Sequence, residues 1–169
     1  MAVSLEVKGL DKIIKTIDNY TKSLNGRMET FVERLMNVGI PVIDQNYTKS
    51  MSRVTTEDYS LQHSTRVEVK NEGEYISATL YVEGEDLAFI EFGAGIYFHT
   101  QDHPKASELG MGVGTYPNQT HAFDDFWWYI GEDGVKHFSR GTGASMPIFK
   151  ASEEMQRQFL TIAKEVFGV

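Results

Sequence analysis

Two histidines four residues apart are the side chains in this sequence best suited to hold a metal ion. His99 and His103 occur in HTQDHP, residues 99–104, with Asp102 between them. On a helix, two histidines at this spacing share one face, as zinc ligands do. Pro104 and the surrounding polar residues favour a loop instead, and no glutamate stands where a zinc-protease motif needs one. A metal-dependent hydrolase that uses His99 and His103 is therefore the weaker interpretation, and we expect no metal site.

A single acid, Glu91, lies inside the apolar stretch FIEFGAGIYF, residues 89–98. The glycines Gly93 and Gly95, and the later run GMGVGT at 110–115, suggest a nucleotide loop. Such a loop needs a helix that opens directly after it, so that amide groups and the helix dipole meet the phosphates. Neither run is followed by a helical pattern, so we expect no cofactor.

Spacing gives Glu91 no catalytic partner, so we expect no catalytic residue here. We expect 89–98 to be a buried aromatic segment whose glycines turn the chain sharply. Glu91 then either caps nearby backbone amides or meets a neighbouring subunit. The paired acids Asp124–Asp125 and Glu132–Asp133 fall at expected turns, where carboxylates are ordinarily solvated.

Both tryptophans lie in FWWY, residues 126–129. Three interpretations stay open for Trp127, Trp128 and Tyr129. They are a satellite core under a long loop, a contact surface, or a carbohydrate-binding platform. Trp and Tyr are enriched among interface anchors, but sequence alone does not separate the three.

Composition excludes several classes of protein. The chain has 169 residues, 41% hydrophobic, and carries a formal charge of −8 with a pI near 5.1. An acidic chain is poorly suited to bind nucleic acid or an anionic membrane. It contains no cysteine, so disulfides and thiolate sites are excluded. No apolar run is long enough to span a bilayer, and the charged N-terminus is unlike a signal peptide, so we expect a soluble, unprocessed protein. The lack of cysteine is compatible with assembly in a reducing cytoplasm.

The apolar pattern predicts a single α+β domain over 1–169. We expect a short first strand ending at Gly9 and then a helix, or helix pair, over about 11–50, weakened at Gly26 and bent at Pro41. STRVEVK and YISATLYVEG predict one β-hairpin, and WWY and VKHF predict a second around the turn GEDG. A loop-rich excursion covers 99–145, and an amphipathic helix ends the chain. The predicted fold is therefore a small antiparallel sheet packed against a long N-terminal and a C-terminal helix.

These elements, in this order, resemble the tail-completion (neck, head–tail joining or minor tail) proteins of long-tailed bacteriophages and prophages. In that family an aromatic and acidic run ends in Glu-Phe-Gly-x-Gly, and a later Pro-Phe-type turn opens the terminal helix. Two sets of residues carry the resemblance. The first is Phe89, Ile90, Glu91, Phe92, Gly93 and Gly95, and the second is Gly143, Ala144, Pro147, Ile148 and Phe149.

The resemblance implies a non-enzymatic virion structural protein that forms a homo-oligomeric ring between the capsid connector and the tail. Its partners would be other neck and tail proteins, with DNA only passing through the lumen, and it would be in the host cytoplasm during assembly. A tail terminator that caps the tube is the alternative. Acids such as Glu83–Asp86 or Asp124–Asp125 either line that lumen or keep the protein soluble. We favour the second explanation. We expect subunit or partner contacts from Phe89, Glu91, Phe92, Gly93, Gly95, Trp127, Trp128, Tyr129 and Pro147.

Overall fold

The computed structural model describes residues 10–51, 63–84, 87–115, 120–131 and 134–168. It has four helices and two β-hairpins in this described part, and it confirms the α+β class. Four elements form the body of the molecule: α1 (Leu10–Met51), β1 (His63–Asn71), β2 (Ile76–Gly84) and α4 (Pro147–Phe167). Two short helices and a small hairpin form one end: α2 (Leu87–Phe92), α3 (Ala106–Leu109), β3 (Trp127–Ile130) and β4 (Lys136–Ser139). The first strand, predicted to end at Gly9, lies outside the described residues.

Helix α1 is one continuous helix of 42 residues, not a helix pair. Gly26 lies in its interior with open space around it, and Pro41 lies within its last third. Of the two alternatives, a helix or a helix pair, the single helix is therefore confirmed, and Gly26 does not interrupt it. A glycine costs only about 1 kcal/mol in a helix, and the apolar stripe on either side of it continues along one face.

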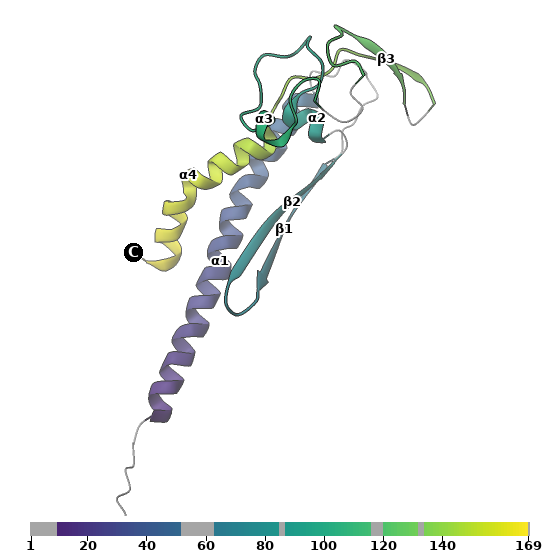
Figure 1. Ribbon diagram of the computed structural model, residues 1–169. Coiled ribbons are helices and arrows are strands. Elements are labelled where there is room, and N and C mark those ends of the chain that lie inside the picture. Colours follow the sequence, from purple (N-terminus) through teal and green to yellow (C-terminus); the bar gives the residue numbers. More distant parts are fainter. Residues whose placement is uncertain (1–9, 52–62, 85–86, 116–119, 132–133, 169) are drawn as a thin grey trace, which may run out of the picture.

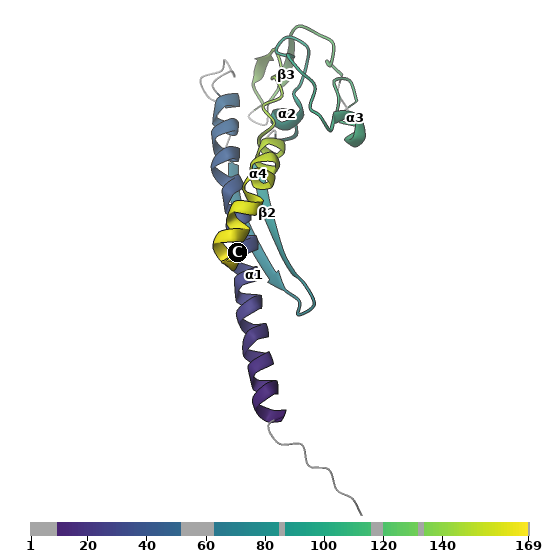
Figure 2. The ribbon, with the colours of Figure 1, turned by 90° about the vertical axis from the view of Figure 1, so that its left-hand side faces the viewer.

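The two ends of α1 have different surroundings. Helix α4 runs antiparallel beside its C-terminal half, and the β1–β2 hairpin lies along the same half (Figure 1). The three elements meet at Gly39, where an added Cβ would lie 2.8 Å from the Leu80 side chain and 3.4 Å from Ala151. The N-terminal half of α1 extends beyond both neighbours, as the two views show (Figures 1 and 2).

Buried side chains follow the line where α1 meets α4. Phe31 packs edge-on against Phe159, with ring centroids 5.2 Å apart, and also touches the ring of Phe167. Farther along α1, Tyr47 is fully buried and stacks on His63 at 4.2 Å. Tyr47 also forms a buried cluster with Ile90 of α2. This last contact joins the helical body to the end that carries the loop-rich excursion.

Both predicted hairpins are present, but as separate two-stranded sheets and not as one sheet. In the first, β1 pairs antiparallel with β2, with Val67 opposite Leu80. In the second, β3 pairs with β4, with Trp128 opposite Phe138. Alternation in the sequence located the strands correctly, but it carried no information about whether the two hairpins join.

Segment 89–98 differs from its prediction. Its first part belongs to the short helix α2, in which Ile90 and Glu91 are buried while Phe89 stays 39% exposed. The predicted turn at the glycines is confirmed. Gly93 and Gly95 both have positive φ, which glycine adopts without a steric penalty. The predicted burial of the segment was wrong for Phe89 and Tyr97, which are 39% and 49% exposed. In the helical part, consecutive side chains are distributed around the helix axis, so they cannot all face the core.

Candidate functional site: the junction around Glu91

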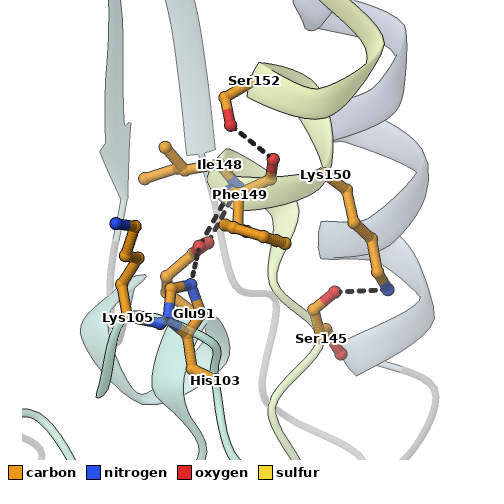
Figure 3. Close-up of polar contacts among 8 residues, drawn as sticks. All are labelled: Glu91, His103, Lys105, Ser145, Ile148, Phe149, Lys150 and Ser152. Atoms are coloured by element: carbon orange, nitrogen blue, oxygen red, sulfur yellow. Dashed lines mark hydrogen bonds and ion pairs between the residues drawn. The ribbon is translucent and has the colours of Figure 1, made fainter. Parts of the chain in front are cut away.

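Glu91 lies at the point where the two ends of the loop-rich excursion meet (Figure 3). One carboxylate oxygen accepts the backbone N–H of Ile148 at 2.8 Å, and the other accepts that of Phe149 at 2.9 Å. These are the second and third residues of α4, whose first amides have no partner within the helix. Met146, at the N-cap, makes no side-chain capping hydrogen bond. Glu91, 57 residues earlier in the chain, therefore caps α4.

The cap is electrostatic as well as hydrogen-bonded. A helix N-terminus carries a partial positive charge, and a carboxylate placed against it is stabilised, most strongly where the site is partly or fully buried. Glu91 is only 4% exposed. Hydrogen bonds to an ionised acceptor are about twice as strong as those between neutral groups. Glu91 thus fixes the position of α2 against the start of α4.

His103 supplies a third donor to the same carboxylate. Its Nε2 lies 3.0 Å from the Glu91 oxygen that also binds Phe149. Its Nδ1 accepts the backbone N–H of Lys105 at 3.0 Å, so the ring proton is assigned to Nε2, which donates to Glu91. The imidazole lies between the rings of Phe92 and Phe149, with centroids 4.5 and 5.1 Å away. Both ring nitrogens of His103 are therefore engaged within the chain.

The two histidines considered as a metal-binding pair lie in different surroundings. His103 is 5% exposed and bonded to Glu91, whereas His99 pairs with Asp102 at 3.3 Å in a more open position. Among the residues that the structure describes, no three His, Asp or Glu side chains gather as a metal site would require. The same described residues contain no helix able to cross a membrane.

The backbone adds a second set of bonds to the junction. The amide of Ser145 donates to the carbonyl of Ile90 at 2.9 Å. Ala94 and Thr142 form an isolated antiparallel bridge with hydrogen bonds of 2.8 and 2.9 Å. Gly93 packs so closely on this returning segment that a Cβ would lie 3.0 Å from the amide nitrogen of Ala144. The segment that follows α2 and the segment that leads into α4 therefore lie side by side.

A third set of contacts ties the junction to α1. Lys150 donates to the backbone carbonyl of Ser145 at 2.7 Å and to the side-chain oxygen of Asn46 at 3.1 Å. The hydroxyl of Ser50 hydrogen-bonds that of Ser145, and both residues are buried. Helices α1, α2 and α4 therefore share one polar cluster at this end of the molecule.

This arrangement gives Glu91 a structural task. All three of its partners are groups of the same chain, and two of them are backbone amides in the first turn of α4. The first of the two roles expected for Glu91, capping of backbone amides, is confirmed. The capped amides belong to a segment distant in sequence, not to residues next to Glu91 in the chain.

The aromatic hairpin does not present one flat platform. Trp127 faces inward, where its ring lies against Gly95 and Gly141 and stacks on His121 with centroids 5.9 Å apart. Trp128 points to the opposite face, is 51% exposed and contacts Phe138 at 5.2 Å. Tyr129 returns to the side of Trp127, as alternation in a strand requires. A carbohydrate platform built from all three rings is therefore contradicted by the geometry.

The residues expected at subunit or partner contacts fall into three groups by burial. Glu91, Gly93, Gly95 and Pro147 are buried inside the chain, where they build the junction. Phe92 and Trp127 are half-buried, whereas Phe89, Trp128 and Tyr129 are exposed. The buried group supports the surface from beneath, whereas the exposed group forms part of the surface itself.

Five members of the junction were not predicted from the sequence: His103 as the partner of Glu91, together with Ser145, Lys150, Asn46 and Ser50. Their pairings span up to 104 residues of sequence. The capped groups are backbone amides, which every residue except proline carries. No local spacing marks them, and only the resemblance of residues 89–95 and 143–149 to two family elements pointed to this part of the chain.

Comparison of the chain with models of protein families, with curated proteins and with solved structures finds no match.

Proposed function

We propose that this chain is a non-enzymatic structural protein of a tailed phage or prophage virion that acts at the head–tail junction. The observation that carries the proposal is the Glu91 junction. The two short elements that resemble the tail-completion family are residues 89–95 and 143–149. Glu91 lies 57 residues before Ile148, but the two elements bind each other directly through Glu91, Ile148 and Phe149. Two motifs that form one structural unit are stronger support than two separate sequence likenesses.

The chemistry of the junction fits an assembly protein. Its buried acid is used to cap a helix, and its buried imidazole supports that acid. The effect is to hold a long excursion, 99–145, on a rigid base. Positioning a loop-rich surface on a fixed scaffold is the usual way in which a protein presents a binding face.

Within the same class, a tail terminator remains the alternative. The two differ in what the absence of the protein does to particles. A neck protein joins finished tails to filled heads, so its loss leaves heads and tails of normal length that stay separate. A terminator ends growth of the tail tube, so without it the tubes have irregular lengths.

The test is therefore deletion of the gene in the phage or prophage that encodes it, followed by electron microscopy of the lysate. We expect separate heads and tails, a fall in infectious particles of several orders of magnitude, and rescue by the wild-type gene in trans. Tubes of irregular length would favour the terminator. Intact, infectious, tailed particles would overturn both assignments.

A further inference from the structure

The N-terminal half of α1 carries an apolar face that nothing in the described structure covers. We call residues 11–27 the α1 arm. All its residues from 11 to 24 are exposed. Five large apolar side chains stand at helical spacing on one face of the arm: Ile13 (62% exposed), Ile14 (50%), Ile17 (57%), Tyr20 (70%) and Leu24 (39%).

This face continues the stripe that is buried farther along the same helix. Phe31 falls in line with it and is 7% exposed, because Phe159 and Phe167 of α4 pack on it. Helix α4 ends at Phe167, so the stripe continues into the arm without a cover (Figure 1). Monomeric soluble proteins rarely expose large contiguous apolar surfaces, and such surfaces mark sites where another molecule binds.

The arm also differs in charge from the rest of the molecule. It contains four basic and two acidic residues, which gives it a net charge of +2: Lys12, Lys15, Lys22 and Arg27 against Asp11 and Asp18. The chain as a whole carries −8, so the remaining residues carry −10. The arm therefore fits an acidic surface that also offers apolar side chains.

Such a surface exists at the other end of the molecule. We call Phe123, Asp124, Asp125, Phe126, Trp128 and Ile130 the hairpin patch; all six are exposed. Phe126 and Trp128 gather on one face of the hairpin around Phe138, with centroids 5.6 and 5.2 Å from it. Ile130, on the same face by alternation, is 67% exposed. Residues 123–140 contain four acids and two bases, which gives this segment a net charge of −2: Asp124, Asp125, Glu132 and Asp133 against Lys136 and Arg140. Lys136 lies 4.9 Å from the Trp128 ring and Arg140 5.6 Å from the Phe138 ring, and His121 pairs with Asp124 at 2.9 Å.

The arm and the hairpin patch cannot meet within one chain. They lie at opposite ends of the molecule in both views (Figures 1 and 2). Helix α1 is continuous between them, and its 42 residues extend for about 60 Å at 1.5 Å per residue. A second copy of the chain can bring the two surfaces together.

We propose that the α1 arm of one copy binds the hairpin patch of the next, in a head-to-tail contact. A contact of this type uses two different surfaces, and it closes into a ring when the rotation between copies allows it. The inference deepens the proposed ring at the head–tail junction and rests on that function for its biological setting. Aliphatic side chains of the arm pack on the aromatic rings, and its lysines face Asp124 and Asp125.

The size of the surfaces agrees with a specific contact. A standard interface covers roughly 800 Å² per partner. Half-exposed side chains of this size each offer on the order of 100 Å², so the five arm residues alone supply more than half of that area. A symmetric arm-to-arm dimer buries the same apolar stripe but brings two positively charged arms together, which charge complementarity disfavours.

Cysteine cross-linking tests the contact directly, because the chain has no cysteine of its own. One chain carries Ile17→Cys in the arm, and a second, isotopically labelled chain carries Ile130→Cys in the hairpin patch. The two are mixed and gently oxidised. Gln156→Cys, at an exposed position of α4, replaces each in turn as the control. We expect the Ile17–Ile130 pair to exceed both symmetric pairs and every pair with position 156.

A charge swap makes the test independent of the cysteine positions. Lys15→Glu with Lys22→Glu in the arm chain lowers the cross-linked fraction about tenfold, and Asp124→Lys with Asp125→Lys in the other chain restores it. Predominance of the Ile17–Ile17 pair, or yields equal to those of position 156, overturns the proposal. That outcome leaves the deletion phenotype unchanged, so failure of the contact is distinguishable from failure of the proposed function.

Discussion

Replacement of Glu91 measures how strongly the junction holds the fold. Glu91→Ala removes three hydrogen bonds to an ionised acceptor and leaves two helix amides and the His103 N–H without a partner. A hydrogen bond to a charged group contributes about 1.5–3 kcal/mol, and an N-cap about 1 kcal/mol. These contributions overlap and do not add, and desolvation of the carboxylate offsets part of them. We expect a loss of about 3–4 kcal/mol.

The substitution Glu91→Gln refines this number. Glutamine keeps the shape and one acceptor oxygen, but its NH₂ group points at a backbone N–H, so we expect a loss of about 2 kcal/mol. Urea unfolding followed by circular dichroism measures both. For a domain of this size, 1 kcal/mol corresponds to about 2–4 °C, so Glu91→Ala should lower Tm by about 6–16 °C.

The matched control is Glu165→Gln. Glu165 also pairs with a cation, Arg34, but both side chains are about half exposed, so the loss should stay within about 1 kcal/mol. If Glu91→Gln destabilises the chain no more than Glu165→Gln does, the carboxylate is not the cap that the geometry describes. The refutation holds whether or not the chain has a partner in the virion.

Three further predictions concern packing and charge. Gly141→Ala should cost at least 2 kcal/mol more than Gly73→Ala in urea unfolding. Both glycines have positive φ, but only at Gly141 would the Cβ strike a backbone carbonyl oxygen, at 1.9 Å. Phe31→Ala should cost about 3–5 kcal/mol, whereas alanine at any of the five exposed apolar positions of the α1 arm should change stability by less than about 0.5 kcal/mol. A hydrogen bond from Tyr81, with a smaller contribution from Lys70, holds the pKa of Glu68 below its usual value of 4.5, so its carboxylate should titrate by NMR below that value. The small stabilisation is present above the unfolded pKa and is lost as pH falls through the folded one, and Tyr81→Phe should raise the midpoint.

The elements of this fold were predictable because their signals are local. A helical stripe from Ile13 to Ile43 and strict alternation through Val67 and Val69 each repeat over a few residues. Errors arose where one element meets another. The sequence did not indicate that the two hairpins stay apart, or that Phe89–Phe92 turns as a helix, because both depend on what packs nearby.

The junction was predictable only in outline. Gly93 and Gly95 predicted a turn, because glycine adopts the positive φ angles that tight turns need. The capping role of Glu91 was one of two expectations, but nothing near it in sequence named Phe149 or His103 as its partner. Long-range hydrogen bonds to backbone groups leave no residue pattern, so a three-dimensional structure was needed to find them.

The central claim is that this chain is part of the neck of a tailed particle, and its position in the virion tests that claim most directly. Purified particles of the phage or prophage that encodes it can be labelled with an antibody or an epitope tag on the chain and imaged by electron microscopy. We predict label at the junction of head and tail, in ring-shaped density that accepts α1, α4 and the two hairpins. Particles without the chain, or label along the tail tube or at its far tip, would contradict the account.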